Sequence, residues 1–254
     1  MAVAHSWKPA HHTPGRAPFE VSDWGGCSSI GHMRSENQDA WGEAHGQRFV
    51  VADGMGGTAG GGMASGLAVG GFLTAEASSR DQWVKTLKKL NRTVQRKCKS
   101  KGFALAGSTL VGLVISRSHC LVASVGDSRV YLARGERVGQ LTSDHNLRNL
   151  RIEEGLPPDA PDNRGRPDAL TAFLGSADQN QRVDVALLPV HPGDRILLCS
   201  DGVHGQISTN ELSRLLTTAG DCTETATALV KAADDAGGHD NSTALVIELG
   251  RKRI

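Results

Sequence analysis

Two apolar segments of this chain each run into an Asp-Gly pair. Residues 49–52 lead directly to Asp53-Gly54, and residues 196–200 lead directly to Asp201-Gly202. Short, continuously apolar segments are typical of strands buried on both faces. An ionised aspartate at the end of such a strand needs something positive to offset its desolvation, and the following glycine lets a ligand approach the backbone and its carbonyl. The pattern therefore indicates a cation site where the two strands end.

Three more aspartates share this setting: Asp39, Asp127 and Asp240 each stand beside Gly or Asn or at a predicted strand end. Carboxylates alone form an oxygen-only environment, which suits Mg²⁺ or Mn²⁺ better than Zn²⁺. Two such ions, ~3.5–4 Å apart and bridged by shared carboxylates, would activate a water and neutralise a phosphoryl group. Arg34 is the first candidate for gripping the phosphate, because guanidinium binds phosphate oxygens bidentately. A single Asp-Gly is also common in turns, so the predicted metal centre depends on all five aspartates together.

The composition fits a domain with a sizeable core. The 254 residues allow one large domain or two small ones. We interpret residues 1–20 as a mobile extension and residues 21–250 as a single domain, because no repeat or linker divides them. The 28 Lys and Arg against 27 Asp and Glu lack the basic excess of a nucleic-acid binder. Only 4% aromatic residues beside 31 glycines favour an aliphatic, β-rich core with many turns.

The cysteines and the hydropathy pattern indicate a cytoplasmic protein. Five dispersed cysteines without a C-x-x-C pair argue against a disulfide framework and for a reducing compartment; they are Cys27, Cys98, Cys120, Cys199 and Cys222. No apolar segment approaches the ~20 residues that span a membrane, and the N-terminal residues do not resemble a signal peptide. We therefore expect no disulfide framework and no membrane contact.

Hydrophobic periodicity predicts strands and helices in runs rather than in strict alternation. Expected strands cover residues 21–30, with a break at Gly25-Gly26, and residues 49–52, 110–115, 121–125, 130–133, 183–187, 195–200 and 242–249. Expected helices cover residues 63–77, 83–98, 146–155, 208–216 and 223–235. Runs of strands joined by hairpins favour mainly antiparallel sheets with helices packed outside, over a parallel Rossmann-type sheet.

The helix expected over residues 83–98 has a strongly basic face. Its apolar residues recur at helical spacing, and its other face carries Lys85, Lys88, Lys89, Arg92, Arg96 and Lys99. A helix surface exposed to water is the usual reason for such a face, and an acidic partner is the alternative.

Seven motifs occur in order along residues 25–249. They are Arg34-Ser35-Glu36-Asn37-Gln38-Asp39, Val51-Ala52-Asp53-Gly54-Met55-Gly56-Gly57, Gly107-Ser108-Thr109, Val125-Gly126-Asp127-Ser128-Arg129-Val130-Tyr131, Leu141-Thr142-Ser143-Asp144-His145, Leu197-Leu198-Cys199-Ser200-Asp201-Gly202 and Asp240-Asn241-Ser242-Thr243. On these motifs the chain closely resembles the bacterial metal-dependent Ser/Thr protein phosphatases of type 2C. The resemblance implies an α+β fold: a four-layer α-β-β-α sandwich of two antiparallel sheets flanked by helices, with the metals at one end of a single catalytic domain.

The resemblance also implies which residues hold the metals, two tightly bound Mn²⁺ or Mg²⁺ ions. Asp53 would bridge both ions and the Gly54 carbonyl would bind one of them, while Asp201 and Asp240 would complete the ligands of the other. Asp127, with Asp201, matches the positions that bind a third, weaker ion in bacterial relatives.

Two further roles follow from the same resemblance. Asp39 would act largely through metal-bound water, and Arg34 would hold the phosphate of the substrate. A hydroxide that bridges the metals would attack phosphorus directly, with no phosphoenzyme. Gln38 stands where many members have Glu, which removes a negative charge near the metals. Met55 stands where animal members place a His proposed as general acid, although Met is usual in bacterial ones.

The mobile flap of the family corresponds to residues of about 147–170. Within it, residues 156–167 contain four prolines, and we do not match their sequence to the flap of the family. Asp159 or Asp162 in this segment could reach the third ion, but a carboxylate that faces solvent is the preferred interpretation.

The resemblance implies hydrolysis of phosphoserine and phosphothreonine in proteins. The expected partners are phosphorylated proteins, either the substrates of a Ser/Thr kinase or the kinase itself, and we expect a monomer. The alternative is a pseudophosphatase that binds phosphoproteins as a regulatory module, and the intact set Asp53, Asp201 and Asp240 argues against it. An enzyme with an aspartyl-phosphate intermediate would need a second Asp two residues after the nucleophile, where this chain has Met55.

Overall fold

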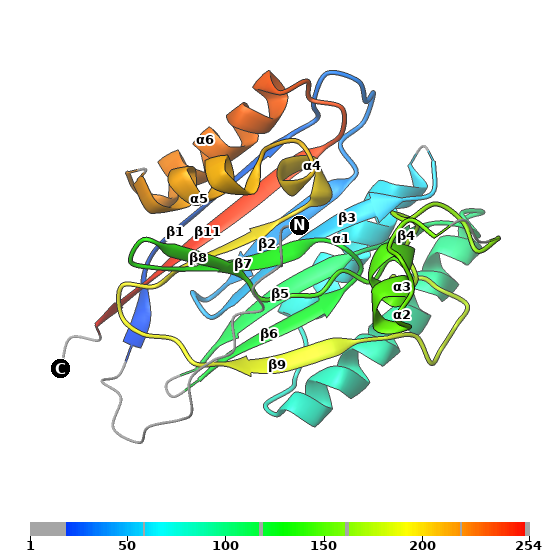
Figure 1. Cartoon of the computed structure of the whole chain (residues 1–254). Helices are drawn as coiled ribbons and strands as arrows, with labels where there is room; N and C mark the ends of the chain where they lie inside the picture. Colours follow the sequence, from blue (N-terminus) through cyan, green and yellow to red (C-terminus); the bar gives the residue numbers. More distant parts are fainter. Residues whose placement is uncertain (1–18, 58, 117–118, 161–162, 219, 252–254) are drawn as a thin grey trace.

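The computed structural model describes residues 19–57, 59–116, 119–160, 163–218 and 220–251. Two antiparallel sheets pack face to face, and helices cover the outer face of each sheet (Figure 1). The predicted α+β sandwich of two antiparallel sheets flanked by helices is therefore confirmed. Most of the expected extension, residues 1–20, lies outside the described residues, but Phe19 and Glu20 already belong to the first strand.

The first sheet has five strands in the order β1-β11-β10-β7-β8. They are β1 (Phe19–Ser29), β7 (Arg129–Arg134), β8 (Arg137–Gln140), β10 (Arg195–Cys199) and β11 (Ser242–Arg251). The predicted break at Gly25-Gly26 is wrong, because these residues pair in register with Val246 and Leu245 of β11. A side chain at Gly25 would collide with Thr223, so this glycine serves close packing rather than a turn.

The second sheet contains β2 (Asp39–Ala44), β3 (Arg48–Met55), β4 (Gly107–Ser108), β5 (Leu110–Ile115), β6 (Cys120–Val125) and β9 (Asp184–Leu188). Five of them follow the order β2-β3-β5-β6-β9, and β4 pairs with the end of β3. The sequence did not predict β2, all of whose residues are half-buried. Its partner β3 is apolar on both faces, as predicted for residues 49–52.

Two helices cover each sheet (Figure 1). Helices α1 (Gly60–Leu73) and α2 (Arg80–Ser100) lie on the second sheet, and α5 (Thr209–Thr218) and α6 (Cys222–Asp235) lie on the first. Two short helices, α3 (Leu147–Glu153) and α4 (Asp201–His204), lie in connecting segments. Within the described part of the chain, no helix has both the length and the apolar composition of a membrane span, and the five cysteines are free.

The apolar core forms three layers, one between the sheets and one under each pair of helices. The alternation of side chains along a strand sends Phe49 and Val51 of β3 between the sheets, and sends Val50 and Ala52 toward α1. Phe72 of α1 is fully buried in that helical layer. Because both faces of β3 are packed, the position of its end is fixed by the core, and that end carries Asp53.

Candidate functional site

The five predicted aspartates meet at one end of the sandwich because their strands begin or end there. Asp39 opens β2 and is the register partner of Asp53 in β3. Asp201 follows β10 as the first residue of α4, Asp240 precedes β11, and Asp127 follows β6. A cavity of about 470 Å³ opens between these ends, and four of the five aspartates line it together with Gly54 and Arg34.

Burial and mutual repulsion make these carboxylates hard to ionise. Burial, then Asp39 and Asp201, raises the pKa of Asp53. Burial also raises the pKa of Asp201, and Asp240 adds to that rise. The pKa of Asp127 rises to about 7, first through burial and then through the charge of Asp201. Several carboxylates held together in a poorly solvated place favour a divalent cation, because its charge offsets both the cost of burial and the mutual repulsion.

Asp39 is held by two hydrogen bonds from side-chain hydroxyls. Its Oδ2 accepts hydrogen bonds from the hydroxyls of Ser200 and Thr243, each at 2.7 Å. Burial raises the pKa of Asp39 to about 6, although these two hydroxyls act in the opposite direction. Its Oδ1 is buried without a hydrogen-bond partner, and so is Oδ1 of Asp201.

These donors fit a hard divalent cation. The cavity offers carboxylate oxygens and the backbone at Gly54, where any side chain would collide with Gly61 and Gln38, and oxygen-only donors suit Mn²⁺ or Mg²⁺. The buried Oδ1 atoms of Asp39 and Asp201, which have no hydrogen-bond partner in the described part of the chain, suit a cation as their partner. Among the described residues, however, no three His, Cys, Asp or Glu side chains are already arranged to hold an ion.

Arg34 is one reason why the carboxylates are not arranged around an ion, because it pairs with one of them. Its Nη2 donates to Oδ2 of Asp240 at 2.6 Å, and this bond raises the pKa of the guanidinium. The side chain of Arg34 is 54% exposed, so it lies at the mouth of the cavity rather than at its base. The predicted phosphate-binding residue and a predicted metal ligand are therefore paired with each other.

Several residues that sequence reasoning did not assign hold the carboxylates in place. Thr109 accepts the backbone N–H of Asp53 at 2.9 Å, and its hydroxyl also bonds to the hydroxyl of Ser128 at 2.7 Å. The side-chain oxygen of Asn241 accepts the backbone N–H of Gln38. All of these residues lie within or directly beside the seven motifs, which was the available signal, but a motif does not show which partner a hydroxyl or amide meets.

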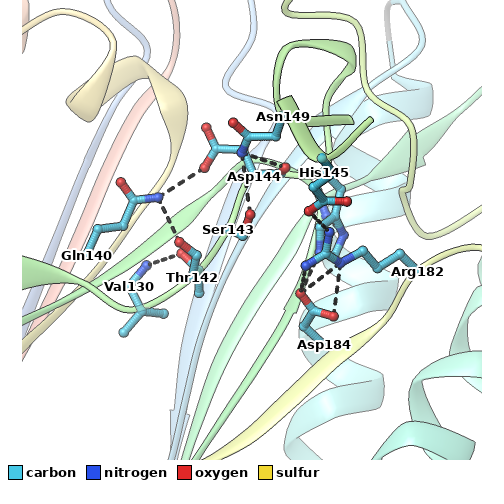
Figure 2. A network of polar contacts seen from close by, with 11 residues as sticks. Val130, Gln140, Thr142, Ser143, Asp144, His145, Asn149, Arg182 and Asp184 are labelled. Carbon is cyan, nitrogen blue, oxygen red and sulfur yellow. Dashed lines mark hydrogen bonds and ion pairs between the residues drawn. The ribbon is translucent and has the colours of Figure 1, made fainter. Parts of the chain in front are cut away.

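The loop that carries Asp127 is anchored by two histidines. His204 Nε2 donates to the backbone carbonyl of Asp127 at 3.0 Å, and burial lowers the pKa of His204 to about 4, so the ring is neutral. His145 Nδ1 accepts the backbone N–H of Gly126 at 3.2 Å, which places the proton on Nε2, facing Asp184. Figure 2 shows His145 beside Asp184 and Arg182. The Asp127 loop is thus tied to strand β9.

The flap segment contributes a residue that the sequence did not single out. After α3 the chain returns to the cavity, where Asp168 and Leu170 form part of the wall. Asp159 is exposed and pairs with Arg148 at 3.0 Å, in line with the preferred interpretation of that residue, and Asp162 lies outside the described residues. The only cue to Asp168 was its place after the last proline of the segment.

Gln38 also has a structural role, in addition to the loss of charge inferred from the sequence. Its Nε2 donates to the carbonyl of Gly57 at 2.8 Å, and its backbone carbonyl accepts from Gly54 N–H and the Ser65 hydroxyl. A glutamate has no donor for the Gly57 carbonyl. The amide therefore braces the glycine-rich turn that forms one wall of the cavity.

The chain is similar to known proteins in both sequence and structure. A family model described as protein phosphatase 2C matches residues 29–241. The serine/threonine phosphatase stp of Listeria monocytogenes is 33% identical over 236 residues, 86% of this chain and 92% of that protein. The structure of the PPM Ser-Thr phosphatase MsPP from Mycobacterium smegmatis in complex with cacodylate has a TM-score of 0.77 and 30% identity, and the match covers 91% of this chain and 100% of that one. The catalytic domain of PstP in complex with two manganese ions shares the fold, with a TM-score of 0.75 and 23% identity over 92% of this chain and 99% of that one.

Proposed function

The chain belongs to the protein phosphatase 2C family and is a metal-dependent protein serine/threonine phosphatase, and we propose that its cavity holds two Mn²⁺ or Mg²⁺ ions between Asp53, Asp201 and Asp240. The observation that supports this assignment is the buried Oδ1 of Asp201, which has no hydrogen-bond partner among the described residues although Asp201 shares the cavity with Asp53, Asp127 and Asp240. Asp53, the Gly54 carbonyl, Asp201 and Asp240 would hold the two ions, with Asp53 shared between them. Asp39 would contribute through water, and Asp127 with Asp201 would hold a third, weaker ion.

When bound, the ions supply an activated water and neutralise the charge of the phosphoryl group. The residues of the chain then position the substrate for direct attack, with no phosphoenzyme. Arg34 would give up its bond to Asp240 and form a bidentate contact with the phosphate. The Asp240 carboxylate would then be available to hold a metal ion. Asp39 is held by two hydroxyls and is the register partner of Asp53, so it would help to keep Asp53 in position.

The partners on this assignment are phosphorylated proteins, the substrates of a Ser/Thr kinase or the kinase itself. A pseudophosphatase is not favoured, because no member of the predicted set of ligands is replaced. The monomeric state and the cytoplasmic location stay predictions.

The experiment is metal-dependent turnover of phosphoserine peptides and p-nitrophenyl phosphate. We expect activity to vanish in excess EDTA and to return with Mn²⁺ best, then Mg²⁺. Asp53→Asn and Asp201→Asn should each lose nearly all turnover while staying folded, because each removes a charge that holds the ions. Asp235→Asn is the matched control, since Asp235 is exposed on α6 and pairs only with Lys231 in the described structure. Turnover in EDTA, or equal activity of all three variants, would refute the assignment.

A further inference from the structure

Six cations form one stripe along the outer side of α2. The α2 cationic stripe consists of Lys85, Lys88, Lys89, Arg92, Arg96 and Lys99. At 3.6 residues per turn these positions fall within an arc of about 100°. The apolar residues that α2 buries against the domain lie on the opposite side: Trp83, Leu87, Leu90, Val94 and Cys98. The stripe therefore faces away from the core.

No acidic residue balances this stripe locally. The sequence has no Asp or Glu between Asp81 and Asp127, and none of the six cations takes part in an ion pair with a described residue. The segment that contacts α2 through Gln179 and Gln95 carries Asp178, whose Oδ1 accepts from the backbone N–H of Asn180. Exposed helices usually mix both signs of charge. Because the whole chain is nearly neutral, the excess on α2 is a local feature.

The segment that follows the C-terminal end of α2 reaches the cavity wall. After α2 the chain turns back on itself, with the N–H of Phe103 bonded to the carbonyl of Cys98. Ala106 then packs so closely on Gly56 that a side chain at Gly56 would collide with it, and Gly56 is part of the cavity wall. Leu105, at the same place, is 88% exposed. A segment bound along the stripe would thus continue into the cavity mouth.

The dimensions suit a peptide segment. The 21 residues of α2 span about 31 Å at ~1.5 Å per residue, which an extended chain of about nine residues covers. The two proposed ions would offset much of the negative charge of the aspartates that line the cavity, so an acidic segment is not excluded from the cavity mouth. Cations on one surface also steer an oppositely charged partner during encounter.

We propose that the α2 cationic stripe binds an acidic segment of the phosphoprotein substrate while the phosphorylated residue occupies the cavity. The proposal rests on the proposed function and specifies its substrate class: phosphoserine or phosphothreonine with a run of Asp or Glu on one side. The partner is a protein segment rather than a nucleic acid, because the chain as a whole has no basic excess.

The test uses the metal-loaded enzyme and peptides with six Glu or six Gln on either side of the phosphoserine. We expect the wild type to prefer one of the Glu peptides, through a lower KM, and to lose this preference as salt is raised. Arg96→Gln/Lys99→Gln should reduce the preference about fivefold, since each exposed charge pair has a modest effect. Lys97→Gln/Lys101→Gln is the control, because it removes the same charge from the same end of α2 but outside the stripe.

Two measurements separate this proposal from the proposed function. Turnover of p-nitrophenyl phosphate, which is too small to reach α2, should be equal in all three proteins. Fluorescence anisotropy with unphosphorylated Glu and Gln peptides measures binding to the stripe even without turnover. No preference for Glu in the wild type, an equal loss in both double variants, or tighter binding of an RNA duplex than of the Glu peptide would each overturn the proposal.

Discussion

Short hydroxyl side chains, rather than cations, hold the aspartates at the base of the cavity. Ser200 and Thr243 each donate to Asp39, and Thr109 receives the backbone N–H of Asp53. A hydroxyl stabilises a buried carboxylate without neutralising it. The two hydroxyls therefore stabilise the Asp39 carboxylate without pairing it with a cation, although burial still raises its pKa to about 6.

The first prediction concerns Thr109, which is buried and links Asp53 to Ser128. Thr109→Val keeps the shape but leaves the N–H of Asp53 without its acceptor. We expect a loss of about 1–3 kcal/mol in the free energy of unfolding, measured by urea denaturation, and weaker Mn²⁺ binding measured by calorimetry.

Thr109→Ser is the matched control, because it retains the hydroxyl and removes only a methyl group. It should recover most of the Mn²⁺ affinity that the valine variant loses. If serine and valine bind Mn²⁺ equally well, the hydroxyl at position 109 does not position Asp53.

At the scale of elements, glycine allows α1 to sit close to the second sheet. Gly112 of β5 lies under the ring of Phe72, and a Cβ there would overlap that fully buried ring. The same sheet carries Asp53 at the end of β3. The close packing of α1 on this sheet therefore determines the position of the glycine-rich turn that connects β3 to α1 and borders the cavity.

The second prediction tests this close packing of α1 on β5 with the substitution Gly112→Ala. A well-packed core that must accept an extra methyl group typically loses about 1–3 kcal/mol, so the variant should unfold at lower urea concentration. Gly66→Ala lies on the open side of α1, where nothing is within 4 Å of the new Cβ, and should stabilise the protein by about 0.5–1 kcal/mol. Similar behaviour of the two variants would contradict this account of Gly112.

Elements with one strong pattern were predictable from the sequence, and those that depend on a neighbour were not. Strand β3 was predicted because residues 49–52 are apolar on both faces. Strand β2 was missed because its half-buried residues, Asp39–Ala44, show no clear alternation. The start of α1 was placed three residues late, since glycine lowers helix propensity while Gly60 and Gly61 are needed for close packing on Ala106 and Gln38.

In the candidate site too, residues in a local motif were predictable, and contacts between distant segments were not. The five aspartates stood out because each lies in a short motif at a strand end. The pairing of Arg34 with Asp240 joins residues 206 positions apart, and no local pattern encodes such a contact. Asp168 lines the cavity only because the flap segment folds back.

For the whole molecule, charge is separated although the total is nearly zero. The cavity gathers aspartates whose pKa values are raised by burial, while α2 presents cations along its outer side. The structure without ions therefore contains carboxylates that oppose one another, and its stability should depend on pH and on divalent cations.

The last prediction concerns this dependence in the metal-free protein. The folded-state pKa of Asp39 is about 6 and that of Asp127 about 7, against about 3.9 in an unfolded chain. Between these values the folded state binds more protons than the unfolded state, so the free energy of unfolding should fall as pH rises from about 4 to about 7. Each such carboxylate should contribute on the order of 1 kcal/mol or more.

Two other groups, Asp184 and His204, also make the free energy of unfolding depend on pH, each in a known direction. The pKa of Asp184 is lowered to about 2, because its bonds to His145 and Arg182 outweigh the effect of burial, so its stabilisation is complete above about pH 5. The lowered pKa of His204, about 4, makes stability rise between about pH 4 and 6.5. To isolate the effect of the Asp127 carboxylate, Tm is measured from pH 5 to pH 8 for the wild type and for Asp127→Asn, and the difference between the two Tm values is compared across this range.

We expect Asp127→Asn to lose less stability than the wild type over this range, and Asp235→Asn on the surface of α6 to follow the wild type. Mn²⁺ competes with protons for the carboxylates, so it should raise Tm more at pH 8 than at pH 5.5. A Tm difference between wild type and Asp127→Asn that stays constant with pH would mean that Asp127 is not a repelled carboxylate in the metal-free fold. A Mn²⁺ effect equal at both pH values would show that the ion does not displace protons from this cavity.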